Sequence, residues 1–442
     1  MNPTSSSEHL PAASPAARGT STRVAMGVMT TIFFMWGFIT ALNDVLIPHL
    51  KSVFTLNYTE VMLVQFTFFG AYFIMSLPSG KVLAHWGYRA SIIIGLIVTG
   101  IGALLFLPAA QAPSYPLFLF AFFVLASGIT LLQVAANPYV SMLGEPRLAS
   151  SRLNLAQALN SLGTTLAPKI GGLLILSTAV LGAAELAKLS PAQQAAYRLQ
   201  QVQMVQAPYL GIALVLFALA AMVWLFRLPP VMNANEADDA HHRFADALKH
   251  RRVWLGMLAI FVYVGAEVSI GSFMINYLSL PQIGGMSEAR AAGFVSLYWG
   301  GAMVGRFIGS ALLTRVDTRK LLATFATIAG ALVLTTMLST GHVAMWSVVA
   351  IGLFNSVMFP NIFTLGIEKF GALTGKVSSL LVMAIVGGAV IPLLQGMLAD
   401  HVGVQHAFVL PLACYAYIVF YGLRGSRAPQ AFAAAGEGEA HA

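Results

Sequence analysis

Twelve apolar runs, each about 20 residues or longer, constrain the fold of this chain more than any other feature of its sequence. A helix that crosses a bilayer needs roughly 20 predominantly apolar residues. The whole chain is 58% hydrophobic and only 9% charged. The sequence therefore predicts an all-α membrane protein with twelve transmembrane helices. The predicted spans are 25–50, 60–83, 90–110, 115–143, 152–177, 207–228, 253–279, 290–314, 319–340, 344–367, 376–399 and 404–424.

The distribution of lysine and arginine predicts how these spans are oriented. If both termini are cytoplasmic, 19 of the 24 Lys and Arg residues, Arg306 among them, fall at cytoplasmic helix ends and loops. Such a bias is typical of the cytoplasmic side of a membrane protein. We therefore expect a multi-pass protein of the cell inner membrane with both termini in the cytoplasm.

Polar segments divide the chain into two halves. Residues 1–23 and 425–442 are predicted to be disordered cytoplasmic tails, because they are rich in small and polar residues. The polar stretch 229–252 follows the sixth span and reads as a cytoplasmic linker, either a short amphipathic surface helix or a plain solvated connection. Residues 24–228 and 253–424 then form two bundles of six helices each.

An internal repeat supports this division. An offset of 224 residues relates six positions of the first half to the second, namely Arg152 to Lys376, Gly163 to Gly387, Pro168 to Pro392, Gly172 to Gly396, Gly128 to Gly352 and Asn137 to Asn361. Weak internal symmetry of this kind is common in transporters, so we predict a duplicated six-helix unit. Separately, Gly301, Gly305 and Gly309 have the spacing that lets two membrane helices approach closely.

Two acidic residues are the main candidates for function. Of the 16 carboxylates, only Asp44 and Glu267 lie well inside predicted spans. Charge inside a bilayer is costly, so such residues usually serve function. Glu267 matches Asn43, the neighbour of Asp44, at the 224-residue offset. We predict that both acids line one water-filled path and exchange protons there. The alternative is that each is a structural acid that ties helices together.

Uncharged amides form a second group of candidate residues. Asn154, Gln157 and Asn160 recur every three residues, which places them nearly on one helix face. An amide donates and accepts hydrogen bonds, as a polyhydroxyl ligand needs, and an aromatic ring can stack on a sugar. Amides also hold membrane helices together, so each one alone is as readily structural. The candidate ligand-binding residues are Trp36, Gln133, Asn137, Gln157, Asn160, Asn276 and Tyr298.

Other classes of function are disfavoured. The Lys and Arg residues are too scattered for a nucleic-acid surface, and the single Cys414 allows no disulfide framework or cysteine metal cluster. The stretch "GALTGKVSS" departs from a phosphate-binding loop, because Gly371 and Gly375 are too close and Val377 replaces the hydroxyl residue. We therefore expect no enzyme, no cofactor, no metal and no nucleic-acid partner.

Four motifs resemble a known family. They are "NDVLIP" (43–48), "AANPYV" (135–140), "RLNLAQALNSLG" (152–163) and "YVGAEVSIGSFMINYL" (263–278). Together they resemble the fucose/glucose-galactose:proton symporter family of the major facilitator superfamily, from about residue 25 to 424. The resemblance implies the major facilitator fold, alternating access and proton-coupled sugar uptake. It also implies that Asp44 couples protons and contacts the sugar, and that Asn43, Gln157 and Asn160 lie at the sugar.

Departures within that family refine the expectation. A fucose permease is expected to carry a glutamate at Gln133 and a glutamine at Glu267, so this chain resembles the glucose/galactose branch. The superfamily's loop signature is only partly kept in "GKVLAHWGYR" (80–89), where Ala84 replaces the usual aspartate. Sodium stays open as an alternative coupling ion.

The sequence as a whole predicts a monomeric secondary transporter, surrounded by membrane lipid, that imports a monosaccharide together with a proton. Asp44 and Glu267 are the predicted coupling residues, and a glucose- or galactose-like hexose is the predicted substrate. The alternatives are fucose or N-acetylglucosamine uptake, sodium-coupled sugar symport and a non-transporting sugar sensor. A drug exporter fits the amide-rich set less well.

Overall fold

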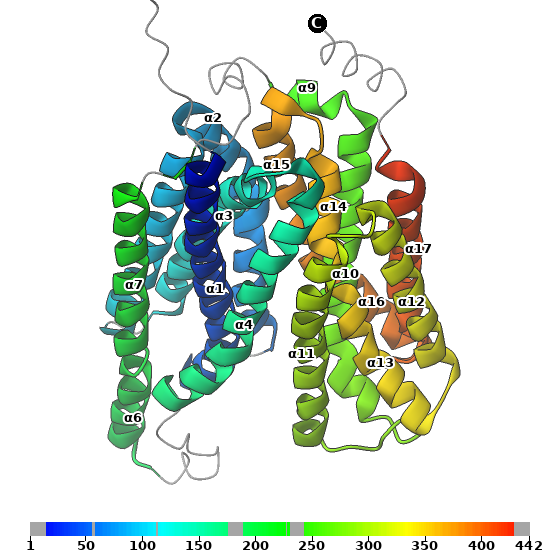
Figure 1. Ribbon diagram of the computed structural model, residues 1–442. Helices are drawn as coiled ribbons and strands as arrows, with labels where there is room; N and C mark the ends of the chain where they lie inside the picture. The colour runs from blue at the N-terminus through cyan, green and yellow to red at the C-terminus, as the bar shows by residue number, and fades with distance from the viewer. Residues whose placement is uncertain are drawn as a thin grey trace, which may run out of the picture.

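The computed structural model describes residues 15–54, 58–111, 114–175, 189–226, 228–229 and 243–427, and no β-strand occurs among them. The helices form two halves that lie side by side, α1 to α7 and α10 to α17 (Figure 1). The elements are α1 (Pro15–Phe54), α2 (Tyr58–Gln111), α3 (Tyr115–Met142), η1 (Pro146–Leu148), α4 (Ala149–Ile175), α6 (Pro191–Gln203), α7 (Gln206–Leu225), α9 (Phe244–Leu248), α10 (Arg251–Leu278), α11 (Glu288–Leu312), α12 (Thr318–Leu338), α13 (Gly341–Asn355), α14 (Met358–Ile367), η2 (Gly371–Leu373), α15 (Thr374–Met383), η3 (Ala384–Val386), α16 (Gly387–Val402), η4 (His406–Phe408), α17 (Val409–Phe420) and η5 (Tyr421–Gly425).

Every predicted span has a helical counterpart. Nine helices or helix runs in the described part of the chain are long and apolar enough to cross a membrane. One of them, Phe66–Gln111, has 46 residues, more than twice the roughly 20 that one crossing needs, so it supplies two spans. The chain turns inside it at Gly87, whose φ of 71° favours glycine. The more polar helices α4 and α11 supply the fifth and eighth spans.

Two of the later spans are interrupted, and a proline follows each interruption. The tenth span is divided into α13 and α14, and the eleventh into α15, η3 and α16. Pro360 has no N–H, so the carbonyl of Ser356, four residues earlier, receives no hydrogen bond from its own helix. Pro392 does the same to Gly388. Carbonyls freed in this way need donors from elsewhere, because lipid offers none.

The first helix begins earlier than the sequence predicts. α1 begins at Pro15, within the segment 1–23 that is predicted to be disordered. Proline is favourable at the first position of a helix, where its missing N–H costs nothing. Residues 1–14 and 428–442 lie outside the described residues, so the expected disorder of both tails stays a prediction there.

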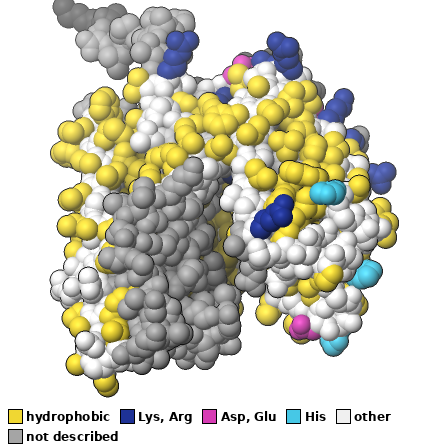
Figure 2. All heavy atoms as spheres, turned by 90° about the horizontal axis from the view of Figure 1, so that it is seen from below, with side chains coloured by type: hydrophobic (Ala, Val, Ile, Leu, Met, Phe, Trp, Pro, Cys, Tyr) yellow, Lys and Arg dark blue, Asp and Glu magenta, His cyan; other side chains and the backbone are white. Residues whose placement is uncertain are grey.

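The outer surface is apolar. Large hydrophobic side chains are exposed on the outside of the helices, among them Phe66, Leu214, Trp224, Leu225 and Leu338. Figure 2, seen from the end opposite α9, shows hydrophobic side chains around the outer margin of the half that contains α1 to α7. Contiguous apolar surface on this scale is unfavourable in water and is what lipid chains cover in a membrane.

Repeat-related glycines make matching contacts in the two halves. A side chain at Gly163 would run into the backbone of Phe34, so α4 packs directly on α1 there. A side chain at Gly387, 224 residues later, would run into the backbone of Phe261, so the start of α16 packs directly on α10. The fifth helix thus meets the first in the same way as the eleventh meets the seventh. These contacts support the predicted duplication.

The three glycines at four-residue spacing on α11 face the break between α13 and α14. A Cβ at Gly301 would lie 3.3 Å from the Leu353 nitrogen, one at Gly305 would overlap the Leu353 carbonyl oxygen and the Ser356 hydroxyl, and one at Gly309 would overlap Val357. The predicted close approach of two helices is therefore confirmed. It holds α11 against the freed carbonyl of Ser356.

The end of the linker is anchored between the halves. Its described part contains the five-residue helix α9, whose first turn is capped by the Asp246 carboxylate accepting from the Arg243 N–H at 2.9 Å. The Phe244 ring packs against Gly80 of α2, and the Lys376 ammonium of α15 lies 5.5 Å from the ring centre. Of the two possibilities for the linker, a short helix is thus present. Residues 230–242 lie outside the described residues.

Substitution of Gly305 tests the close approach on α11. We expect Gly305→Ala to cost about 1–3 kcal/mol, because the added methyl overlaps a backbone oxygen that cannot easily move. The matched control is Gly300→Ala on the same helix, where a Cβ has no neighbour within 4 Å and no loss is expected. Thermal unfolding of the purified variants in detergent measures both. Equal midpoints for the two variants would contradict the packing described.

Candidate functional site

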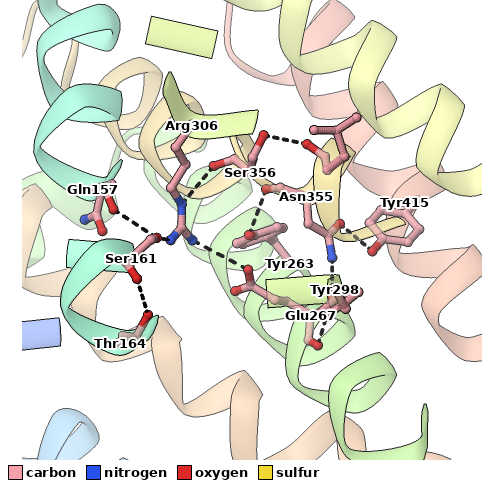
Figure 3. A network of polar contacts seen from close by, with 11 residues as sticks. Gln157, Ser161, Thr164, Tyr263, Glu267, Tyr298, Arg306, Asn355, Ser356 and Tyr415 are labelled. Carbon is pink, nitrogen blue, oxygen red and sulfur yellow. Dashed lines mark hydrogen bonds and ion pairs between the residues drawn. The ribbon is translucent and has the colours of Figure 1, made fainter. Parts of the chain in front are cut away.

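A buried ion pair lies at the contact between the halves. The Arg306 Nη2 on α11 lies 3.7 Å from the Glu267 Oε1 on α10, and each side chain is only 12% exposed. The same guanidinium donates from Nη1 to the Ser161 hydroxyl on α4, and from Nε to the Ser356 carbonyl oxygen at 3.3 Å (Figure 3). Arg306 therefore contacts both halves of the molecule. The planar fork of arginine, with its five donors, suits such a triple contact.

Local structure explains why Arg306 reaches this place. Gly305, the preceding residue, lets α11 close on the break after α13. The Ser356 carbonyl that Arg306 binds there is the one that Pro360 leaves without a helical donor. Glu267 lies near the middle of the 28-residue helix α10 and supplies the counter-charge. A helix break, a small residue and an acid thus combine to hold one arginine in an apolar protein.

A network of phenols and one amide supports Glu267 from behind. The Tyr298 hydroxyl donates to the Glu267 carbonyl oxygen at 3.3 Å and accepts from the Asn355 Nδ2 at 2.7 Å. The Tyr415 hydroxyl donates to the Asn355 Oδ1 at 2.6 Å, and the Tyr263 hydroxyl donates to the Asn355 carbonyl oxygen at 3.0 Å. These four side chains are fully buried (Figure 3). They fix α10, α11, α13 and α17 relative to one another.

The first half contributes buried amides with unused hydrogen-bonding atoms. Gln133 on α3 donates from Nε2 to the Tyr72 hydroxyl on α2 at 2.8 Å, but its Oε1 has no partner among the described residues. The same holds for both amide atoms of Asn137 and for the Nε2 of Gln157. Buried polar atoms are nearly always paired, so these unpaired amide atoms are open to a water molecule or a polar ligand.

The other candidate ligand-binding residues have mixed surroundings. Trp36 is buried on α1, within hydrogen-bonding reach of the Tyr72 hydroxyl. Asn160 donates from Nδ2 to the Phe33 carbonyl oxygen at 2.9 Å, so its donor holds α4 to α1. Asn276 is exposed near the end of α10. The Tyr298 hydroxyl is already used in the network behind Glu267.

Asn43 and Asp44 belong to α1, but their side chains lie outside the described residues. The roles expected for them therefore stay predictions.

Polar contacts join the two halves at the end of the molecule that carries α9. We call them the polar seam: Ser150 to Thr364 at 2.6 Å, Ser151 to Ser310 at 3.3 Å between hydroxyls, Asn154 Nδ2 to Asn361 Oδ1 at 3.0 Å, and Ser378 Oγ to the Val134 carbonyl oxygen at 2.8 Å. Pro138 explains the last contact, because it leaves the Val134 carbonyl without a helical donor. In Figure 1 the two halves meet at this end and diverge towards the other.

Two helical bundles with a charged, polar centre between them have the architecture of a secondary transporter. Residues 25–385 match the sequence profile of the Major Facilitator Superfamily, and the chain belongs to that superfamily. It is thus a multi-pass membrane protein of a transporter class rather than an enzyme.

Several bacterial sugar transporters are similar to it over nearly their whole length. The glucose/galactose transporter of Brucella abortus is 52% identical over 91% of this chain and 94% of that protein. The putative glucose/galactose transporter of Helicobacter pylori is 43% identical over 92% of this chain and 98% of that protein. A crystal structure of the Escherichia coli fucose:proton symporter superposes with a TM-score of 0.86 and 34% identity, covering 92% of this chain and all of that one.

The sequence interpretation missed the residue that joins the site together. It counted Arg306 with the cytoplasmic helix ends, which is wrong, since the side chain is buried against Glu267 and Ser161. An arginine six residues before the end of a helix resembles one that extends its charge outwards to the membrane surface. The available signal was its place within the predicted span 290–314, eight residues before the end of that span.

A double-mutant cycle tests the ion pair. We expect Glu267→Gln and Arg306→Gln each to cost about 3–5 kcal/mol, because either one leaves a buried charge unpaired. The double variant should lose less than the sum, because no unpaired charge remains. Unfolding midpoints in detergent measure all three variants. The exposed pair of Lys249 and Asp246 is the control, and its cycle should show almost no coupling.

Proposed function

We propose that this protein is a secondary active transporter that imports a monosaccharide by proton symport, with alternating access between its two halves. The observation that carries the proposal is the buried pair of Glu267 and Arg306, which contacts both halves at once. Charges inside a membrane protein are costly and usually mark an ion or substrate path. The printed names of the relatives, glucose/galactose transporters and a fucose:proton symporter, support a sugar and a proton as the two substrates.

Proton coupling is assigned to Asp44, together with Glu267. The two acids occupy nearly equivalent places on the first and seventh helices of the duplicated unit. A carboxylate beside a wet path can bind a proton from one side and release it to the other. Proton and sugar transport are then coupled if the site switches from one side of the membrane to the other only when both the proton and the sugar are bound.

The sugar is assigned to the polar groups of the first half. Gln133, Asn137 and Gln157 offer unpaired amide atoms, and Trp36 offers a ring that can stack on the apolar face of a hexose. Asn43 completes the set. The helix contacts of Asn160 and Tyr298 suit them to positioning these groups, and exposed Asn276 is the outermost member.

A glucose- or galactose-like hexose is the favoured substrate. The relatives that carry those sugars in their names are 52% and 43% identical, against 36% for the L-fucose-proton symporter. Gln133 is a neutral amide in this chain, whereas the resemblance predicts a glutamate there in a fucose permease. Fucose and N-acetylglucosamine are the competing substrates, and sodium is the competing ion.

The proposed orientation puts the polar seam on the cytoplasmic side. Lys and Arg are in excess at that end, which is typical of the cytoplasmic side of a membrane protein. Both termini are accordingly assigned to the cytoplasm, and the protein to the inner membrane. The described arrangement is then closed towards the cytoplasm. A structure of the fucose:proton symporter in the outward conformation superposes with the same TM-score of 0.86. We propose that the working unit is the monomer.

Transport assays in proteoliposomes test this proposal. We expect uptake of labelled glucose or galactose against its gradient when the outside is acidic, and a panel of unlabelled sugars ranks the substrates. Asp44→Asn should abolish concentrative uptake but keep exchange of sugar for sugar, because only the coupling to protons is lost. Asp400→Asn removes an exposed carboxylate near the end of α16 and is the control that should transport normally.

Three results would count against the proposal. Uptake driven by a sodium gradient but not by a proton gradient would replace the coupling ion. Proton-driven uptake by Asp44→Asn at the wild-type rate would remove the coupling role of Asp44. Sugar binding without any uptake or exchange would indicate the sensor instead.

A further inference from the structure

The hydrogen bonds and the charge of Arg306 point to different partners. Its two hydrogen bonds go to the Ser161 hydroxyl and the Ser356 carbonyl oxygen. Glu267 lies at 3.7 Å, and its Oε1 has no hydrogen bond within the described part of the chain. Glu267 therefore compensates the charge of Arg306 without fixing its geometry. Ser161 and Ser356 fix its geometry without compensating its charge.

The bond to Ser161 belongs to a row of contacts along one helix face. Ser150, Asn154, Gln157 and Ser161 follow one another on α4 at intervals of three or four residues, so they lie on one side of the helix. Ser150 and Asn154 belong to the polar seam. The contact between Ser161 and Arg306 continues the seam to the centre of the protein. When the halves part at the seam, this contact must break as well.

Arg306 is also the only formal charge that faces Glu267 from the described residues around it. The other titratable neighbours are the phenols of Tyr263 on α10, Tyr298 on α11 and Tyr415 on α17. Phenols are neutral near pH 7. The pair of Glu267 and Arg306 is therefore neutral as a unit. It becomes positive when the carboxylate loses its charge.

We infer that Arg306 is a positioning residue that links the charge of Glu267 to closure of the polar seam. While Glu267 is ionised, the guanidinium is stable between the halves and holds Ser161. When Glu267 is neutralised, an uncompensated cation remains in an apolar site, so the guanidinium is driven towards water and its bond to Ser161 is lost. Linkage is reciprocal, so opening of the seam also favours neutralisation of Glu267. This inference rests on the proposed function and adds that the charge of Glu267 controls whether the polar seam is closed.

Cross-linking across the seam tests the inference without any sugar. Ser151 and Ser310 have hydroxyls 3.3 Å apart, so Ser151→Cys with Ser310→Cys reports the closed seam in a background where Cys414→Ala removes the native thiol. In this background we expect Glu267→Gln, Ser161→Ala and Arg306→Lys each to lower the closed-to-open ratio by about tenfold, the effect of one charge-assisted hydrogen bond. The lysine variant keeps the charge but has no fork to hold both Ser161 and Ser356.

The matched control is Thr164→Val, one turn along α4 from Ser161. Its hydroxyl donates to the Ser161 carbonyl oxygen at 2.8 Å and has no contact with Arg306, so cross-linking should stay at the background level. A pH series separates a charge link from a merely structural contact. The closed fraction of the background protein should fall as the pH is lowered, whereas that of Glu267→Gln should be low throughout. Reading each pH against Glu267→Gln removes the pH dependence of thiol chemistry.

The outcomes are distinct. Unchanged cross-linking in Glu267→Gln would overturn the inference, whether or not Ser161→Ala opens the seam. The same holds if Arg306→Lys, which keeps the buried charge and is the variant best able to fold, cross-links as well as the control. Absence of sugar uptake by the wild-type protein alongside the expected cross-linking would refute the proposed function and leave this link standing.

Discussion

A backbone carbonyl inside a bilayer must find a donor within the protein, because no water is at hand to supply one. Pro138 and Pro360 each remove a helical donor, and the freed carbonyls become acceptors near the contact between the halves. One receives the Ser378 hydroxyl from the opposite half, and the other receives the Arg306 guanidinium. Prolines in related spans thus create two of the polar contacts at and near the boundary between the halves.

The two halves, predicted to be a duplicated unit, contribute different groups at their contact. The second half supplies a charged pair supported by a fully bonded network around Asn355, so its position is fixed from several helices. The first half supplies amides with unpaired atoms, among them both amide atoms of Asn137. A charged pair from one half and unpaired amide atoms from the other are polar groups that a ligand between the halves could use. The contacts that correspond between the halves, such as those of Gly163 and Gly387, are packing contacts between helices and involve no polar side chain.

Sequence reasoning succeeds here for local properties, and fails for properties that depend on residues distant in the sequence and close in the fold. The spans follow from apolar length alone, and the tight face at Gly305 follows from the absence of a side chain. Glu267 stands out in the sequence because an acidic residue inside a membrane span is costly and usually functional. Arg306 does not stand out, since only the folded chain shows that its charge turns inwards to Glu267. Asn160 likewise has a side chain suited to binding a ligand, but its amide nitrogen donates to a backbone carbonyl of α1.

Phe244 at the end of the linker gives the seam a second kind of stability. Its ring packs against Gly80 of one half with the Lys376 ammonium of the other nearby, so parting the halves there exposes aromatic surface to water. Exposure of apolar surface raises the heat capacity, whereas the hydrogen bonds of the seam contribute little of that kind. The balance between the closed and open arrangements should therefore curve with temperature. On cooling, the contribution of the buried aromatic surface to the closed arrangement weakens, and the polar contacts then dominate its stability.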